Sequence, residues 1–322
     1  MQTRLLQFLL WILILTGGCK REKIRIGLLM DDFSSERWYK DKQFFQEQAK
    51  RLGCEVLIDS AMGDADRQYS QAEKMLISGV NVLVVIPSNS EKASAIVDLA
   101  HRHHVPVISY DRLIKICPVD FYISFENAYV GELMANYLLQ RCPKGNYVII
   151  SGPSSDFNSF FVKYGQLVVL QPYIQIKDIK IIFDSTVKEW SENEGYRLMT
   201  ECLKSAEEPN AVLAANDDLA NGVIRALKEA GLAGKVLVSG QDADSEAIKN
   251  ILSGNQTMTV YKPIETIAFS AVNAVFRLTK KEPLLEANKY INTGKKMVPS
   301  ILLPSTAVSK DNIKIVFNNN RE

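Results

Sequence analysis

The chain has 322 residues, of which 47% are hydrophobic and 23% are charged, an ordinary composition for a globular protein. Its 38 basic and 37 acidic side chains leave a formal net charge of +1, and the sequence contains no tract of lysine or arginine. This balance argues against nucleic acid or another polyanion as a partner, because such partners require a broad positive surface. The length predicts two lobes, since a single core rarely grows beyond about 250–300 residues.

The first segment, residues 1–19, is predicted to be an export signal. Arg4 supplies a positive charge, residues 5–15 are apolar apart from one glutamine, and small residues lead to Cys19. The apolar stretch is shorter than the ~20 residues of a membrane-spanning helix, and it fits a cleavable signal. The segment also resembles a bacterial lipobox, in which Cys19 becomes the lipidated first residue of the mature protein. The alternative is a plain signal peptide with an incidental cysteine.

The remaining cysteines and the histidines give no sign of a metal site. The other cysteines are Cys54, Cys117, Cys142 and Cys202. They form no CxxC pair, which argues against zinc, and their spacing defines no disulfide pairing although export would permit one. Small buried thiols are the favoured interpretation. All three histidines lie in HRHH at 101–104, at the end of an expected helix, where positive charge favours the helix dipole.

After residue 22 the chain alternates between strand-like and helix-like segments. Helical periodicity is clear in 37–53, where Phe45, Ala49 and Leu52 are spaced i, i+4 and i+7. Apolar runs rich in β-branched residues occur at 24–30, 55–59, 80–87, 105–111 and 121–125. Strands that alternate with helices in this way predict a parallel sheet covered on both faces.

The same alternation restarts around Glu126 and predicts a second doubly wound α/β lobe. Residues 127–142 indicate a helix, and strand-like runs follow at 146–153, 179–186, 211–217 and 235–242. Late in the chain come a short strand at 257–263, a long helix at 265–280 and an extended piece at 298–304. These are too few for a third domain, so the chain is expected to cross back between the lobes, and several segments would then form a hinge.

This organisation predicts the boundaries of the two lobes. We expect an N-terminal lobe made of residues 23–126 and 262–290, and a C-terminal lobe made of 127–261 and 291–322. No low-complexity linker separates them, which favours a compact hinge over tethered modules.

Polar and aromatic side chains gather directly after the predicted strands. In open parallel sheets, ligands bind outside the carboxyl ends of the strands. The residues at these positions are Arg37, Trp38, Lys40, Asp111, Arg112, Asp156, Asn158, Trp190, Asn216, Asp242 and Lys262. Such a set suits a sugar, because hydroxyl groups both donate and accept hydrogen bonds and charged partners strengthen those bonds. A tryptophan ring can cover the flat apolar face of a pyranose.

Several stretches carry a family resemblance. They are DDFSSERWYKD at 31–41, VISYDRLI at 107–114, DFYISFENAYVGEL at 120–133, VSGQDAD at 238–244 and QTMTVYKP at 256–263. They resemble the corresponding stretches of bacterial periplasmic D-xylose-binding proteins, within the ribose- and galactose-binding superfamily, and the likeness extends from Lys23 to about Asn312. The resemblance implies the type I periplasmic binding protein fold, with two lobes and three hinge crossings that close around one sugar.

The resemblance also implies roles for individual residues. Trp38 and Trp190 match the two aromatic positions that flank the sugar ring. The matched hydrogen-bonding positions are Arg37, Lys40, Asp111, Arg112, Asp156, Asn158, Asn216, Asp242 and Lys262. Phe157 departs from the pattern, since the family has an amide there, and Thr186 stands where a further tryptophan is common.

These observations predict an exported solute-binding protein that captures a monosaccharide, D-xylose foremost, without changing it. No cofactor or metal is expected, and the sequence has no P-loop, GxSxG or HExxH motif and no GxGxxG turn after its first strand. The protein is expected to be a monomer, lipid-anchored in the periplasm or outside the cytoplasmic membrane, whose closed form docks on an ABC sugar transporter.

Alternatives to this prediction concern the partner, the ligand and the activity. The closed form could dock on a membrane sensor kinase instead of a transporter, or the ligand could be a different pentose or hexose. A sugar-modifying enzyme on a similar fold is the alternative from another class. A cytoplasmic sugar-responsive repressor is disfavoured, because an export signal stands where DNA-binding helices would be.

Overall fold

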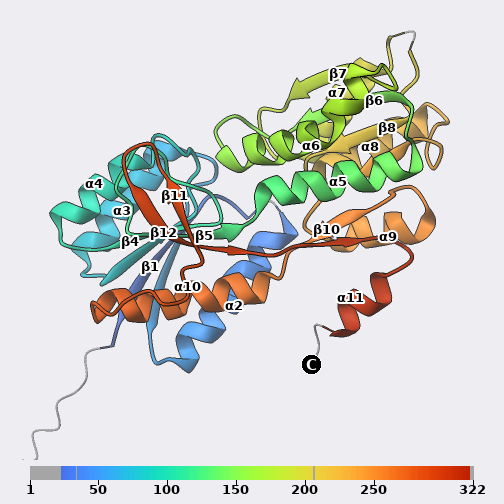
Figure 1. The fold of residues 1–322 in the computed structure, drawn as a ribbon. Coiled ribbons are helices and arrows are strands. Elements are labelled where there is room, and N and C mark those ends of the chain that lie inside the picture. Colours follow the sequence, from blue (N-terminus) through green and yellow to red (C-terminus); the bar gives the residue numbers. More distant parts are fainter. Residues whose placement is uncertain (1–22, 34, 206, 320–322) are drawn as a thin grey trace, which may run out of the picture.

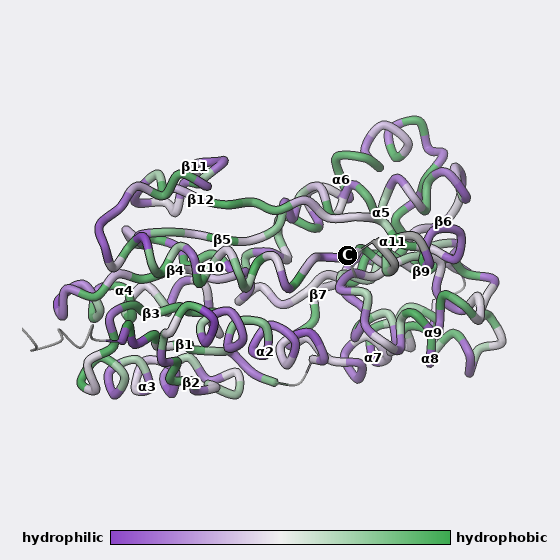
Figure 2. The backbone as a smooth tube through the Cα atoms, turned by 90° about the horizontal axis from the view of Figure 1, so that it is seen from below, coloured by the Kyte–Doolittle hydropathy of each residue, from purple (hydrophilic) through white to green (hydrophobic). Residues whose placement is uncertain are grey.

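The computed structural model describes residues 23–33, 35–205 and 207–319, which form two lobes (Figure 1). The predicted signal segment and Cys19 lie outside these residues. Seen from below, the lobes occupy opposite ends of an elongated molecule, and the segment that leaves the last long strand of the first lobe runs toward the second (Figure 2).

The N-terminal lobe is built on a seven-stranded sheet with the order β11-β12-β5-β4-β3-β1-β2. Neighbouring strands are parallel except for β11 and β12, which are antiparallel. The strands are β1 (Arg25–Met30), β2 (Glu55–Ser60), β3 (Val82–Val85), β4 (Val107–Tyr110), β5 (Phe121–Phe125), β11 (Lys289–Asn292) and β12 (Met297–Leu303).

Helices cover both faces of this sheet, as the continuous apolar strands require. Helices α2 (Glu36–Arg51) and α10 (Ile264–Thr279) pack on one face, and α3 (Ala65–Ile77) and α4 (Ser94–Arg102) pack on the other. Strand β1 shows the division: Leu28 belongs to the first apolar cluster and its neighbour Leu29 to the second. Successive side chains of a strand point to opposite faces, so both clusters draw on the same strands.

The C-terminal lobe repeats the design around a parallel four-stranded sheet of order β7-β6-β8-β9. Its strands are β6 (Gly145–Ser151), β7 (Ile179–Thr186), β8 (Ala211–Ala214) and β9 (Leu237–Ser239). Its helices are α5 (Asn127–Arg141), α6 (Phe157–Gln175), α7 (Glu192–Cys202), α8 (Asp217–Glu229), α9 (Ser245–Ser253) and α11 (Ile313–Asn319). Helices α5 and α6 cover one face, and α7 and α8 cover the other.

The chain crosses between the lobes three times. The crossings lie between β5 and α5, between β10 (Thr259–Tyr261) and α10, and between β12 and β13 (Thr306–Val308). Strands β10 and β13 pair antiparallel with each other. The second and third crossings therefore leave from adjacent strands.

The expected boundary at residue 291 is wrong. Strand β12 pairs in parallel with β5, from Ser300 opposite Tyr122 to Leu303 opposite Phe125, and β11 pairs with β12. The chain therefore stays in the N-terminal lobe until Leu303 and returns to the C-terminal lobe only at β13. An isolated apolar run near the end of a chain does not reveal which sheet it joins, because that choice is made by contacts distant in sequence.

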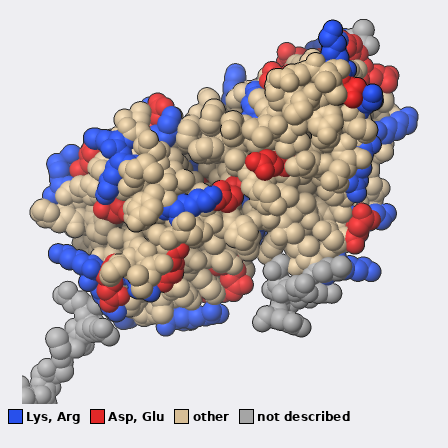
Figure 3. Space-filling model, in the orientation of Figure 1, with Lys and Arg blue, Asp and Glu red and all other residues tan. Residues whose placement is uncertain are grey.

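Three further observations concern the expectations about composition. The cysteines Cys54, Cys117, Cys142 and Cys202 are unpaired, and among the described residues no group of histidine, cysteine, aspartate and glutamate side chains could hold a metal ion. Within the same residues, no helix combines the length and the apolar character needed to cross a bilayer. Figure 3 shows basic and acidic side chains interspersed over both lobes on the face in view.

Candidate functional site

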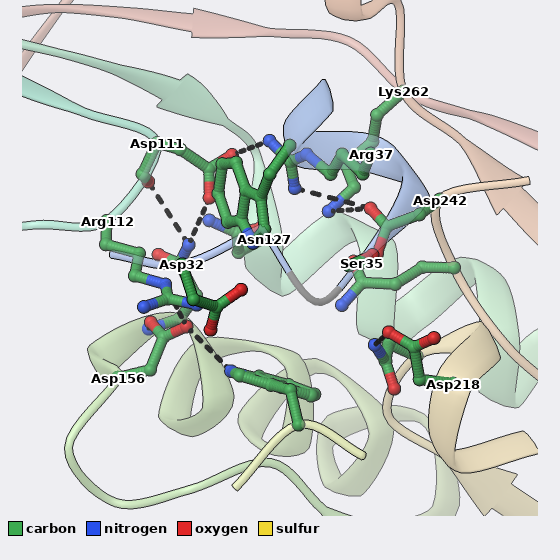
Figure 4. A pocket seen from close by; sticks show the side chains of 15 residues that line it. Asp32, Ser35, Arg37, Asp111, Arg112, Asn127, Asp156, Asp218, Asp242 and Lys262 are labelled. Carbon is green, nitrogen blue, oxygen red and sulfur yellow. Dashed lines mark hydrogen bonds and ion pairs between the residues drawn. The ribbon is translucent and has the colours of Figure 1, made fainter. Parts of the chain in front are cut away.

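A pocket lies between the lobes, where the strand ends of both sheets meet (Figure 4). It encloses about 490 Å³ of space between atoms, including the part open to solvent. Every residue predicted for the site except Lys40 lines it. The lining residues are Asp32, Ser35, Arg37, Trp38, Asp111, Arg112, Asn127, Asp156, Asn158, Trp190, Asn216, Asp218, Gln241, Asp242 and Lys262.

Arg37 is at the start of α2 and joins three carboxylates. Its side chain is 5% exposed; Nε lies 3.2 Å from Asp41 Oδ2, Nη1 lies 3.3 Å from Asp242 Oδ1, and Nη2 pairs with Asp111. Burial alone would raise the pKa of Asp111, but Arg37 and Lys262 hold that pKa below its usual value. The charged forms of both partners are therefore maintained inside the pocket. Since Asp242 belongs to the C-terminal lobe, Arg37 also connects the lobes.

Arg112 lies just after β4 and, like Arg37, pairs with carboxylates of both lobes. Its Nη1 lies 2.5 Å from Asp31 Oδ2 and donates to the carbonyl oxygen of Pro87 at 3.2 Å. Its Nε lies 2.8 Å from Asp156 Oδ2, which belongs to the C-terminal lobe. The pKa of Asp156 is raised, because the effect of burial outweighs the opposing effect of the Arg112 charge. Asp156 also caps α6, accepting the backbone N–H of Asn158 at 2.9 Å, so the helix start and the ion pair hold one carboxylate in place.

Contacts across the pocket show that the lobes are closed on each other. Besides the two arginine pairs, Asn158 Nδ2 donates to the backbone oxygen of Asp111 at 3.1 Å and to its Oδ1 at 3.2 Å. Lys262, at the second crossing, places Nζ 2.7 Å from Asp242 Oδ1 and is 3% exposed. Both lobes and the hinge thus contribute to one hydrogen-bonded set.

Two of these aspartates have an unusual backbone conformation. Asp111 has φ +60° and Asp242 has φ +97°, values that residues other than glycine rarely adopt. At Asp111 the N–H of Arg112 donates to the carbonyl of Tyr110 at 2.7 Å and closes a three-residue turn. Such strain persists where the surroundings enforce it, and it occurs most often at functional sites. The sequence carries no signal of it.

Both predicted tryptophans line the pocket, and each contacts different neighbouring side chains. Trp38 is 6% exposed, and the guanidinium carbons of Arg37 and Arg112 lie 4.6 Å and 5.3 Å from the centre of its ring. Trp190 is half-buried, and its Nε1 donates to Asp156 Oδ2 at 3.2 Å. Each indole is therefore oriented by a charged group that also belongs to the pocket.

Lys40 is the one predicted site residue that the structure keeps out of the pocket. Its Nζ lies 2.5 Å from Glu36 Oε1, and its side chain is 45% exposed. Glu36 in turn accepts the N–H of Ser245 at 3.1 Å and its hydroxyl at 2.9 Å, across to the C-terminal lobe. Residues i and i+4 share one side of a helix, so Lys40 accompanies Glu36 at the rim and not Arg37 inside.

Five lining residues were not predicted: Asp32, Ser35, Asn127, Asp218 and Gln241. Asn127 begins α5 directly after β5, so the rule that selects residues following strands could have found it. Gln241 directly precedes Asp242, and Asp218 is in the first turn of α8, beyond its cap Asn216. The position of Asp218 depends on where α8 begins, which the sequence did not specify.

Two acidic side chains of the C-terminal lobe have raised pKa values. Burial, together with Asp242, raises the pKa of Asp218 to about 6. Burial, together with Asp242, Asp218 and Glu36, raises the pKa of Asp244 to about 8, while Lys40 opposes the rise. Because these pKa values exceed the ordinary 3.8, both groups stabilise the folded protein at low pH, and that stabilisation is lost as the pH rises through the raised pKa.

We therefore expect Asp244→Asn to be more stable than the wild type at pH 8. The gain should be at least about 1 kcal/mol there, since each unit of pKa corresponds to about 1.4 kcal/mol, and it should shrink as the pH falls toward 4. Urea unfolding of both proteins from pH 4.5 to 8.5 measures it. A difference that does not change with pH would contradict the raised pKa; Glu246→Gln, an exposed exchange on α9, serves as control.

Comparison with known proteins gives consistent matches. Residues 26–283 match the model of a periplasmic binding protein domain. The chain is 41% identical over 301 residues to the D-xylose-binding periplasmic protein of Haemophilus influenzae, covering 93% of this chain and 90% of that protein. It is also 41% identical over 305 residues to the D-xylose-binding periplasmic protein of Escherichia coli, covering 94% and 92%. A carbohydrate transporter solute-binding protein from Chloroflexus aurantiacus, solved with D-glucose, aligns with a TM-score of 0.87 and 28% identity, covering 91% and 95%.

Proposed function

Because the chain belongs to the periplasmic binding protein family, we propose that it encloses one monosaccharide, D-xylose foremost, in the pocket between its lobes. The observation that carries the proposal is the lining of the pocket. Both lobes and the hinge contribute cationic, carboxylate and amide side chains to it, and these lie beside two tryptophans. A sugar presents adjacent hydroxyl groups and an apolar ring face, and this lining complements both.

The polar groups of the pocket suggest how hydroxyls would be bound. Arg37, Arg112 and Lys262 can only donate, and Asp111, Asp156 and Asp242 accept when ionised. Among the described residues, the buried oxygens Asn158 Oδ1 and Gln241 Oε1 have no hydrogen-bond partner. Buried acceptors are normally satisfied, so these two would receive sugar hydroxyls.

The remaining predicted contacts follow the same division of roles. Asn216 Oδ1 already accepts the N–H of Leu219 at 3.0 Å, so its Nδ2 is the group that would reach a sugar oxygen. Trp38 and Trp190 would cover the two sides of the ring, which buries apolar area without needing a polar partner. In this arrangement the sugar touches both lobes only when they are closed, so binding would favour the closed state.

The proposed role is delivery in the periplasm, without chemical change of the sugar. The matched relatives are named binding proteins, and the solved relative is a transporter component. The closed form would dock on an ABC transporter as a monomer tethered through Cys19. A pull-down with membrane components would distinguish a transporter from a sensor kinase.

Calorimetry with a panel of sugars tests the proposal. We expect the purified protein to bind D-xylose at one site, more tightly than D-glucose or D-ribose, and to release it unchanged. Equal or tighter binding of D-ribose would overturn the xylose assignment. Formation of a product would favour the enzyme alternative, and absence of binding to every sugar would overturn the proposed function.

A glycine beside the pocket gives a second prediction. A Cβ on Gly152 would lie 2.0 Å from Cη2 of Trp190 and 2.5 Å from Oγ of Ser159. We expect Gly152→Ala to displace the indole and weaken sugar binding by about tenfold, or ~1.4 kcal/mol, while the lobes stay folded. Titration calorimetry measures the affinity, with Ser154→Ala, an exposed exchange in the same loop, as control. Unchanged affinity would show that Trp190 does not cover the sugar.

A further inference from the structure

A second set of contacts joins the lobes outside the pocket. The backbone N–H of Ser90 donates to the carbonyl of Ser155 at 2.9 Å, and the N–H of Phe157 donates to Ser90 Oγ at 3.2 Å. Ser90 precedes α4 in the N-terminal lobe, whereas Ser155 and Phe157 belong to the turn into α6 in the C-terminal lobe. Neither Ser90 nor Phe157 lines the pocket.

The ring of Phe157 reaches into the N-terminal lobe. It packs against the apolar cluster of that lobe which contains Leu113 and Val119, and Nζ of Lys115 lies 4.4 Å from its ring centre. Lys115 also pairs with Glu91 at 3.0 Å, so its ammonium is held in place. A cation over an aromatic face is attracted to it, and the partly buried ring adds apolar area to the contact.

The ring is also oriented from its own side. Phe160 stacks on Phe157 with ring centres 5.3 Å apart and planes 2° apart, and Phe161 meets it edge-on at 5.0 Å. These neighbours restrict the ring, so less conformational entropy is lost when it enters the other lobe. An amide at position 157 would offer neither the stack nor the apolar contact.

We infer that Ser90, Lys115, Ser155 and Phe157 form a clasp that raises sugar affinity by favouring the closed state, without helping to choose the sugar. The inference rests on the proposed function. Contacts made only in the closed state increase its population, and the apparent dissociation constant is the intrinsic one divided by the population of the competent state. A contact that touches no ligand changes that population by the same factor whatever sugar is bound.

Calorimetry and stopped-flow tryptophan fluorescence on Phe157→Ala test the clasp with each sugar that the wild type binds. We expect the dissociation constant of every sugar to rise by the same factor, about tenfold, mainly through faster dissociation, because the clasp must open before the sugar can leave. Phe157→Leu, which keeps the apolar contact, should show a smaller common factor. Tyr164→Ala, a 54% exposed aromatic on the same helix, serves as the control and should bind as the wild type does.

Hydrogen exchange measured without sugar tests the same clasp independently. The N–H of Ser90 should exchange faster in Phe157→Ala than in Tyr164→Ala, because its acceptor belongs to the other lobe. Unchanged exchange at Ser90, or factors that differ from sugar to sugar, would overturn the clasp. If the wild type binds no sugar, the proposed function fails, while the exchange experiment still decides whether the clasp holds the lobes together.

Discussion

Sugar binding should be abolished in Arg112→Ala. This guanidinium is 5% exposed and lies between Asp31 of its own lobe and Asp156 of the other, so alanine leaves two buried carboxylates without their cation. Removing one partner of a buried ion pair costs about 3–5 kcal/mol, which corresponds to a loss of affinity of more than about a hundredfold. We expect both carboxylates to reach water when the lobes separate, so the penalty should fall mainly on the closed state.

Titration calorimetry with D-xylose measures this loss, and circular dichroism shows whether the lobes remain folded. Arg67→Ala removes an exposed arginine from α3 of the same lobe and should bind as the wild type does. Wild-type affinity in Arg112→Ala would mean that neither the pocket nor the bridge to Asp156 takes part in binding.

A large loss of stability is expected for Arg37→Ala. Arg37 is buried among Asp41, Asp111 and Asp242, and its removal leaves three carboxylates without it. The free energy of unfolding at pH 7 should fall by about 3–5 kcal/mol. Arg37→Lys keeps the charge but cannot reach three carboxylates in different directions, so an intermediate value is expected.

The pH dependence of this defect follows from Asp41. Burial raises the pKa of Asp41 to about 6, and Arg37 opposes the rise, so removing Arg37 should raise that pKa further. A folded-state pKa above the unfolded one stabilises the fold at low pH, and this stabilisation is lost as the pH rises through the folded value. The difference in the free energy of unfolding between the wild type and Arg37→Ala should therefore be larger at pH 8 than at pH 5. Urea unfolding midpoints at pH 5 and at pH 8 measure this difference. A difference that becomes smaller toward pH 8 would contradict the raised pKa of Asp41.

The sequence predicted much of the pocket lining because a general rule of parallel sheets applies to it. Arg112, Asp156 and Asp242 were chosen only for following apolar runs, and the carboxyl ends of those strands meet at one pocket. The family resemblance reinforced these positions, which the structure brings together in the lining.

The failures have physical causes that local sequence patterns do not contain. Lys40 is one turn from Arg37, and only the rotation of α2 against the sheet decides that it stays at the rim. Strand β12 reads as an extended apolar run, but its partner β5 is more than 170 residues away. The positive φ values of Asp111 and Asp242 and the reach of Phe157 into the other lobe are likewise set by tertiary contacts.

The position of β12 has a consequence for how the molecule assembles as it is made. This strand lies inside the seven-stranded sheet, between β11 and β5, so the sheet stays incomplete until Leu303 is available. Domains usually fold in the order of synthesis, the N-terminal one first. Here the C-terminal lobe can form its four-stranded sheet from residues 145–239 while the N-terminal lobe still lacks two strands. The four-stranded sheet of the C-terminal lobe can thus be complete before the sheet of the lobe that begins the chain, and until β12 is added β5 presents an unpaired edge that must be kept from other chains.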